Sequence, residues 1–87
     1  MYIILVYDVE TKRVAKVLKL CRQYLTWIQN STFEGELSPV QYKQMLLKLK
    51  KIIKPDYDSI IVFCNKMGIK PQKQIIGVSK NEDNAFL

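Results

Sequence analysis

The fold of this 87-residue chain depends on the stretch YIILVYD at residues 2–8. Its β-branched and aromatic side chains do not alternate cleanly with polar ones, a pattern typical of a central strand that is covered on at least one face. Asp8 stands at the carboxyl end of this predicted strand. Such a carboxylate either accepts hydrogen bonds from backbone amides in the following turn or belongs to a functional site, and the strand alone leaves both interpretations open.

An amphipathic helix is predicted directly after that strand, over residues 11–25. Apolar residues recur there with the i, i+3, i+4 and i+7 spacing of a helix face. A stripe of one charge sign favours a phosphate-facing surface, although a plain solvated face stays possible. The polar side carries five basic residues with no acidic residue between them: Lys12, Arg13, Lys16, Lys19 and Arg22.

The middle of the chain predicts strand structure followed by a second helix. Residues 27–37, WIQNSTFEGEL, are either one bent strand with a bulge at Gly35 or two short strands paired as a hairpin. The next helix is predicted to begin at Ser38, because a serine, a proline and a glutamine at residue 41 supply its cap and first turn. Pro55 ends the run of helical spacing.

Two more strands are predicted at residues 59–64 and 72–79, with a loop at 66–71 between them. Counting residues 27–37 as two strands, the order predicts an α+β, ferredoxin-like βαββαβ chain with an extra C-terminal strand. In that fold two helices cover one face of an antiparallel sheet. We expect a domain at residues 1–79 and a tail at 80–87 that contacts a dimer mate or another partner. A second copy would cover the free face of the sheet.

The amino-acid composition limits which partners and which kinds of active site this chain can have. Fourteen Lys and Arg against eight Asp and Glu give a formal net charge of +6, which favours nucleic acid or an acidic membrane surface, unless the lysines serve solubility alone. The absence of histidine excludes a His-based zinc site, a Ser-His triad and a histidine general base. Cys21 and Cys64 lie far apart in the sequence, and we expect both to be buried, reduced thiols.

The apolar opening reaches Asp8 after only seven residues. This run is too short for the core of a signal peptide or for a membrane span. We therefore expect a cytoplasmic protein without a membrane-spanning segment, and we expect nucleic acid as its polyanionic partner, not a membrane.

Carboxylates are the side chains that this sequence offers for metal-assisted phosphodiester chemistry, and Asp8 is the best placed of them. A magnesium ion keeps several waters and needs only one or two carboxylates plus phosphate oxygens. One Asp8 per chain is marginal, but two related by a dimer axis would suffice. Trp27 and Phe33 either stack on bases or pack in the core. Tyr7 is either a packing aromatic of the strand or a participant in the site with Asp8.

Three features together resemble CRISPR-associated protein 2, the small subunit of the spacer-acquisition machinery. They are the Tyr7-Asp8 end of the first strand, the basic first helix, and the block QNSTFEGEL at residues 29–37 before a Ser-Pro helix start. The similarity extends over essentially the whole chain. Ser31 and Phe33 match the family's second-strand motif, whereas Trp27 departs from it, because many members carry an arginine at that position.

The resemblance implies more than the residues alone do. It implies a homodimer in which the C-terminal strand is exchanged to extend the partner's sheet, and a catalytic Asp8, beside Tyr7, that binds Mg²⁺ as one of a pair. The implied activity is a metal-dependent endonuclease acting on single-stranded RNA or double-stranded DNA. The implied assembly is one in which the dimer bridges the CRISPR-associated integrase, CRISPR-associated protein 1, and holds the prespacer DNA duplex along its basic residues.

Two alternatives to the nuclease stay open at this point. The first is a non-catalytic architectural clamp that holds DNA and bridges the integrase. The second is a stand-alone RNA-cleaving toxin built on the same small scaffold. The neighbouring genes would separate the second from the first, since a repeat array with an integrase gene indicates adaptation and an antitoxin gene indicates a toxin.

Overall fold

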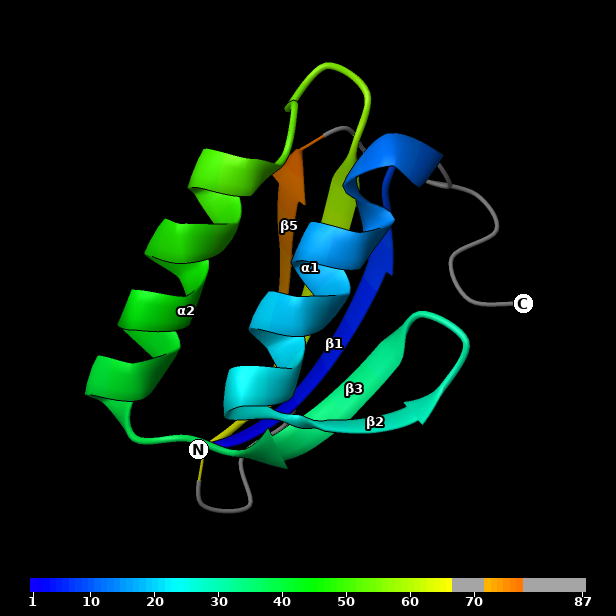
Figure 1. Cartoon of the computed structure of the whole chain (residues 1–87). Coiled ribbons are helices and arrows are strands. Elements are labelled where there is room, and N and C mark those ends of the chain that lie inside the picture. Colours follow the sequence, from blue (N-terminus) through cyan, green and yellow to red (C-terminus); the bar gives the residue numbers. More distant parts are fainter. Residues whose placement is uncertain (67–71, 78–87) are drawn as a thin grey trace.

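The computed structural model describes residues 1–66 and 72–77, and the predicted tail at 80–87 and most of the predicted loop at 66–71 lie outside them. The described residues alternate between strands and helices in the predicted order (Figure 1). The elements are β1 (Tyr2–Asp8), α1 (Thr11–Tyr24), β2 (Thr26–Gln29), β3 (Thr32–Glu36), α2 (Pro39–Ile52), β4 (Ser59–Asn65) and β5 (Gln72–Gly77).

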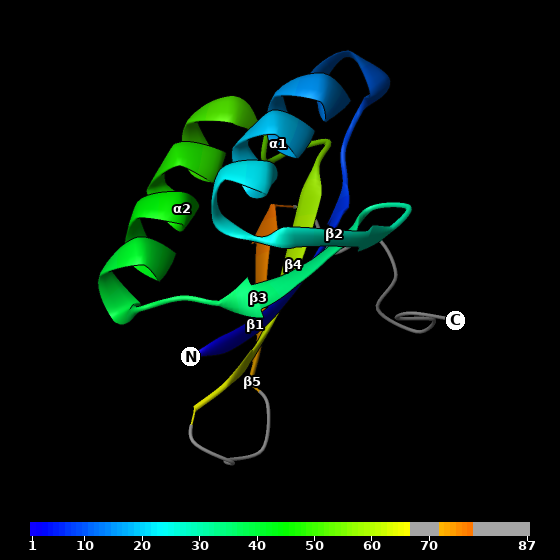
Figure 2. The same ribbon diagram turned by 60° about the horizontal axis from the view of Figure 1, so that its bottom comes forward.

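The strands form one sheet in the order β2-β3-β1-β4-β5, with every neighbouring pair antiparallel. Both helices cover the same face of this sheet (Figures 1 and 2). The ferredoxin-like α+β prediction is therefore confirmed, with β1 at the centre. The 27–37 segment is a hairpin of two strands, and its turn places Asn30 at φ 49°, a left-handed conformation that asparagine tolerates well. The β2–β3 register also shifts between Trp27 and Gln29.

The core lies between the sheet and the helices. Along β1, Ile3, Leu5 and Tyr7 are buried, whereas the side chains between them are only half-buried. This alternation follows from the two-residue repeat of a strand, which turns successive side chains to opposite faces. Cys21 and Cys64 are both buried free thiols, as predicted. Burial raises the pKa of Cys21 to about 12, so this thiol is unreactive at neutral pH.

The start of α2 follows the sequence signal closely. The Ser38 hydroxyl accepts a hydrogen bond from the Gln41 backbone N–H at 3.1 Å, and the Gln41 side chain accepts one from the Ser38 N–H at 2.9 Å. Pro39 occupies the first turn, where its missing N–H costs nothing. These contacts fix where α2 begins.

The last strand completes the sheet of its own chain. It pairs with β4 from Ser59 opposite Gly77 to Cys64 opposite Gln72. Exchange of this strand with a second copy stays a prediction, because a single chain does not test it. Within residues 1–66 and 72–77, neither helix is long and apolar enough to cross a membrane.

Gly77 provides a test of how β5 is seated. Its φ is +99°, and a Cβ added to it would lie 2.0 Å from the Asp58 carbonyl oxygen. We expect Gly77→Ala to lower the free energy of unfolding by about 2–4 kcal/mol, because both the conformation and the space exclude a side chain. Urea unfolding followed by circular dichroism measures the loss.

Gly35→Ala is the matched control for this substitution. A Cβ at that position would meet the Leu25 Cδ2 methyl at 3.1 Å, which is the end of a flexible side chain. We expect a loss of less than about 1 kcal/mol. If both substitutions lower the free energy of unfolding equally, the close contact between Gly77 of β5 and the Asp58 carbonyl would be contradicted.

Candidate metal and nucleic-acid site

Asp8 is the last residue of β1, and its side chain is exposed. It lies opposite Ser59 of β4 in the sheet register. Strand alternation places it on the face of Ile4 and Val6, which is the face that the helices leave uncovered. The structure thus presents a carboxylate at one end of an open sheet surface, where a cation or a second copy of the chain can reach it.

Tyr7 faces the other way, into the core. Its side chain is buried, and its ring centroid lies 6.3 Å from that of Phe33. Burial, and to a smaller extent the neighbouring Cys21, raise the pKa of the Tyr7 phenol, so it stays protonated at neutral pH. The sequence paired Tyr7 with Asp8 as catalytic residues, but the structure places their side chains on opposite faces of the sheet. We therefore assign Tyr7 a packing role.

The described part of the chain does not form a ready-made cluster of metal ligands around Asp8. Across the described ranges, 1–66 and 72–77, no group of three or more Asp, Glu, Cys or His residues comes together. Magnesium prefers oxygen ligands and can be held through one or two carboxylates together with waters and phosphate oxygens. The Asp8 carboxylate has the right chemistry for that ion, and residues 1–66 and 72–77 do not surround it with a ready-made cluster of protein ligands.

The second-strand motif supports β1 from the side of β3. The Tyr7 backbone N–H donates to the Ser31 carbonyl oxygen at 3.1 Å, and Phe33 is fully buried against the Tyr7 ring. Ser31 and Phe33 therefore shape the end of the strand that carries Asp8. Trp27 is half exposed, and its indole N–H donates to the Asn30 carbonyl oxygen at 2.9 Å. That contact holds an aromatic surface at the edge of the sheet.

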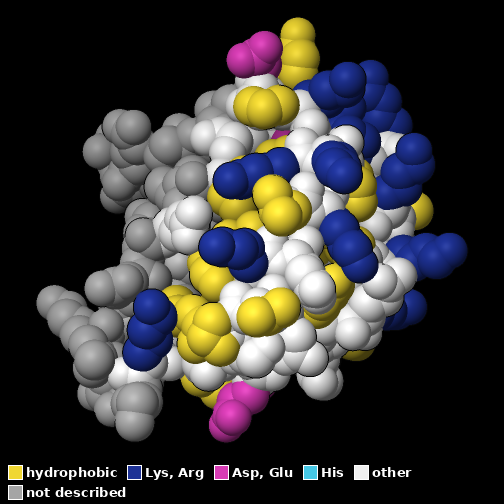
Figure 3. Space-filling view, turned by 90° about the vertical axis from the view of Figure 1, so that its left-hand side faces the viewer, with side chains coloured by type: hydrophobic (Ala, Val, Ile, Leu, Met, Phe, Trp, Pro, Cys, Tyr) yellow, Lys and Arg dark blue, Asp and Glu magenta, His cyan; other side chains and the backbone are white. Residues whose placement is uncertain are grey.

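Four of the five predicted basic residues lie exposed along α1. Figure 3 shows how Lys and Arg side chains gather on the helical side of the molecule, with few acidic side chains on that face. An exposed stripe of one sign is the arrangement that backbone phosphates require. The members of this basic stripe are Lys12, Lys16, Lys19 and Arg22.

Arg13 does not belong to the basic stripe, and this corrects the sequence prediction. The residue is only 7% exposed. Its Nη2 donates to Asp58 at 2.8 Å and to Glu10 at 2.6 Å, and its Nε donates to the second Asp58 oxygen. A guanidinium held in this fork is not available to grip a phosphate. The helical spacing of the sequence did not distinguish a buried arginine from an exposed one.

Asp58 is the structural residue that the sequence analysis missed. Its side chain is fully buried, and besides Arg13 it accepts hydrogen bonds from the backbone N–H groups of Glu10 at 2.9 Å and Lys54 at 2.8 Å. These bonds, led by those from Arg13, hold the pKa of the Asp58 carboxyl well below its usual range. The loop that follows Asp8 is thereby tied to the segment that follows α2.

Comparison with known proteins places the chain in a family. The sequence model described as CRISPR associated protein Cas2 matches residues 1–68. The chain is 45% identical over 83 residues to a Thermotoga maritima protein named CRISPR-associated endoribonuclease Cas2, with 95% of each chain covered. A Pyrococcus furiosus protein of the same name is 43% identical over 81 residues, with 93% of each chain covered.

A solved structure agrees with this match. The crystal structure of Streptococcus pyogenes Cas2 at pH 6.5 superimposes with a TM-score of 0.70 at 33% sequence identity, covering 76% of this chain and 87% of the other. Sequence and backbone geometry therefore point to the same family.

The buried ion pair predicts a large loss of stability when its acceptor is removed. Asp58→Ala leaves two backbone N–H groups without their acceptor in the core and leaves the buried Arg13 guanidinium with only the Glu10 carboxylate as its charged partner. We expect the unfolding temperature to fall by about 10 °C or more. Glu10→Gln is the control, because the Glu10 side chain is 44% exposed and its pair with Arg13 is solvated. A similar small effect of both substitutions would contradict a structural role for Asp58.

Acid sensitivity follows from the same carboxylate. Because its pKa is lower in the folded chain than in the unfolded one, its stabilising contribution is complete above an unfolded value of about 4 and is lost as pH falls below it. We expect the urea midpoint of the wild type to drop more steeply between pH 5 and pH 2 than that of Asp58→Asn. Asp56→Asn, at an exposed position, should keep the wild-type slope. Parallel slopes for wild type and Asp58→Asn would refute the assignment.

Proposed function

The chain belongs to the family of CRISPR-associated protein Cas2, and on that premise we propose that it is a CRISPR adaptation protein that binds nucleic acid as a homodimer and cleaves it with Mg²⁺. The observation that carries the proposal is the exposed Asp8 carboxylate at the end of an open sheet face. The names of the T. maritima and P. furiosus relatives support cleavage of RNA, and double-stranded DNA is the second candidate substrate.

The uncovered sheet face supports a dimer. It presents the half-buried apolar side chains of Ile4 and Val6 from β1 and of Ile61 and Phe63 from β4. Burying them against a second copy stabilises the assembly through the hydrophobic effect. The same symmetric contact would bring in a second Asp8, whose carboxylate would add to the ligands that residues 1–66 and 72–77 offer a metal ion. A homodimer would therefore both cover the open face of the sheet and complete the metal site.

In this proposal Asp8 and the lysines of α1 have different roles. The paired Asp8 carboxylates would hold the magnesium ion, and the bound ion would activate water and neutralise charge on the scissile phosphate. Lys12, in the first turn of α1, follows Asp8 by four residues and is suited to hold the adjoining phosphate. Lys16 and Lys19 continue that contact along the helix, in place of the buried Arg13.

An architectural role without cleavage is the second candidate. The observation that favours it is the separation of the two functions, since the basic stripe lies on the helical side of the sheet whereas Asp8 faces the open side. Duplex DNA can therefore bind along α1 without any phosphate reaching Asp8. In this role the dimer would bridge CRISPR-associated protein 1 and hold a prespacer duplex.

Substitution of Asp8 separates the two candidates. We expect Asp8→Asn to lower Mg²⁺-dependent cleavage of single-stranded RNA or duplex DNA by at least about 100-fold, because the bound ion loses a charged ligand. Glu36→Gln is the control, an exposed carboxylate at the other end of the same sheet. Sedimentation of the same samples checks that each variant keeps its oligomeric state. Undiminished cleavage by Asp8→Asn would contradict the assignment of Asp8 as a catalytic residue. If the Asp8→Asn variant still supports spacer acquisition, the architectural role is favoured.

Charge reversal tests the basic stripe. We expect Lys12→Glu with Arg22→Glu to weaken duplex binding at least about tenfold in 0.1 M salt and to flatten its dependence on salt concentration, because phosphate contacts release counterions. Lys43→Glu with Lys50→Glu makes the same change of net charge on exposed positions of α2 and should have a smaller effect. If the two double variants lose affinity equally, binding depends on net charge and not on the stripe.

A further inference from the structure

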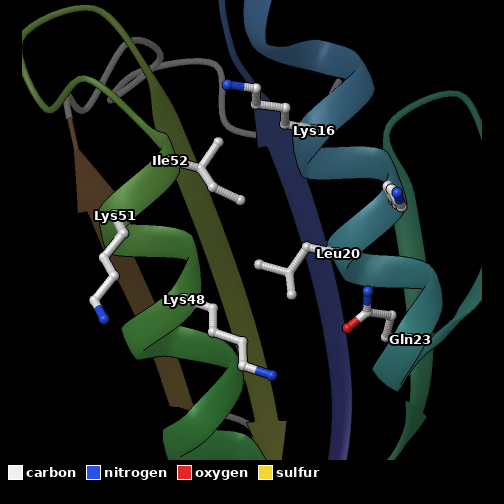
Figure 4. Close-up of a pocket in the computed structure, with 7 residues that line it drawn as sticks. Lys16, Leu20, Gln23, Lys48, Lys51 and Ile52 are labelled. Carbon is white, nitrogen blue, oxygen red and sulfur yellow. The ribbon is translucent and has the colours of Figure 1, made fainter.

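A groove of about 380 Å³ lies between α1 and α2 (Figure 4). The side chains of Leu20 and Ile52 point toward each other from the two helices and form its apolar floor. Among the described residues that line this α1–α2 groove, none is acidic. Four exposed lysines border the floor: Lys16 and Lys19 from α1, and Lys48 and Lys51 from α2.

The dimensions of the groove favour a small, flat occupant. Its volume is at the lower end of the range of about 300–1,000 Å³ that is usual for ligand sites. Its α1 side runs from Lys16 to Gln23, a rise of only about 10 Å. A helix of a partner protein would need apolar contacts over about two turns, whereas this floor consists of one leucine and one isoleucine. The groove therefore suits one planar group and not a helical segment.

A nucleotide combines the two chemistries that the groove offers. The face of a base packs on apolar side chains, and the phosphates on either side of the base attract ammonium groups. The Gln23 amide both donates and accepts hydrogen bonds, so it can pair with the polar edge of a base. The Lys48 Nζ lies 5.2 Å from the centroid of the Tyr24 ring, which adds an aromatic surface one turn of α1 from Leu20.

An unpaired base can reach this floor, but a paired base cannot. In a duplex the base faces are stacked on one another, and a protein meets phosphates and base edges. Duplex DNA bound to the lysines would therefore leave the surface of Leu20 and Ile52 in contact with water. In a single strand the bases can turn away from one another and pack on protein side chains. The apolar floor thus favours single-stranded nucleic acid.

The groove is continuous with the basic stripe. Lys16 and Lys19 belong to both, so a strand whose phosphates follow α1 passes the open side of the groove. Lys48 and Lys51 add cations on the α2 side. The homodimer of the proposed function would bury the sheet face opposite to the helices, and the groove would stay accessible (Figure 2).

We propose that the α1–α2 groove is a base-binding subsite for single-stranded nucleic acid. One unpaired base packs on Leu20 and Ile52, and the phosphates on either side of it bind the four lysines. The subsite rests on the nucleic-acid binding of the proposed function, but it requires neither cleavage nor a metal ion. It gives the helical side of the molecule a preference for unpaired over paired strands.

Removal of the bases tests the subsite while every phosphate is kept. The two ligands are a thymidine oligonucleotide of about eight units, a usual length for a single-strand site, and a strand of the same length built only of abasic units. In EDTA, where metal-dependent cleavage is prevented, we expect the intact strand to bind about five- to tenfold more tightly, because only its bases can pack on the floor.

The outcomes of this comparison separate the subsite from the proposed function. Equal affinities for the intact and the abasic strand would overturn the subsite and leave nucleic-acid binding in place. If neither these strands nor duplex DNA binds, the proposed function and the subsite both fail. Thymidine triphosphate distinguishes a free nucleotide from a base within a strand. If it binds as tightly as the intact strand, the groove is a mononucleotide site and the single-strand proposal is overturned.

Two variants of α2 locate the base. Ile52→Gln should remove most of the difference in affinity between the intact and the abasic strand, because it makes half of the floor polar. Leu47→Gln is the matched control, since Leu47 is 56% exposed on the same helix and does not line the groove. Circular dichroism checks that both variants are folded. An undiminished base preference in Ile52→Gln would place the base elsewhere, for example on the exposed Trp27, and would overturn the proposal.

Methyl NMR of the wild type supplies a readout that needs no substitution. We expect the intact strand to move the Leu20 and Ile52 methyl resonances upfield, because the ring current of a base above them shields their protons. The abasic strand and blunt-ended duplex DNA should not produce this upfield shift. If the intact strand binds without the shift, the proposal is overturned, and the groove is left to a different occupant such as an acidic protein segment.

Discussion

The buried carboxylate of Asp58 is the constraint on which the functional end of the molecule depends. Taking a carboxylate out of water is costly, and the cost is offset only when charged and backbone donors surround it. Here the donors come from α1, from the loop after β1 and from the segment after α2. One side chain therefore joins three segments that are distant in the sequence, and it fixes the turn that directly follows Asp8.

The two-residue repeat of β1 places the buried Tyr7 and the exposed Asp8 on opposite faces of the sheet. Tyr7 turns inward to Phe33 and the helices, and Asp8 turns outward onto the open sheet. As a consequence the cations of α1 and the carboxylate that would bind a metal are not neighbours on one surface. In the proposed function, a nucleic acid bound along α1 would pass the end of the sheet near Lys12 before its backbone could meet Asp8. Binding and cleavage would then use different faces of the sheet, and a chain could keep the first without the second.

Much of the architecture could be predicted from the sequence, because its signals are local. The helical spacing at residues 11–25 and the serine, proline and glutamine at the start of α2 are contained within a few turns, and both elements formed where they were expected. The partners of Arg13 could not be predicted in the same way. Asp58 is 45 residues away, and only the tertiary fold brings the two together. The orientation of Tyr7 could not be predicted either, because a strand of continuous apolar residues does not indicate which of its faces packs against the helices.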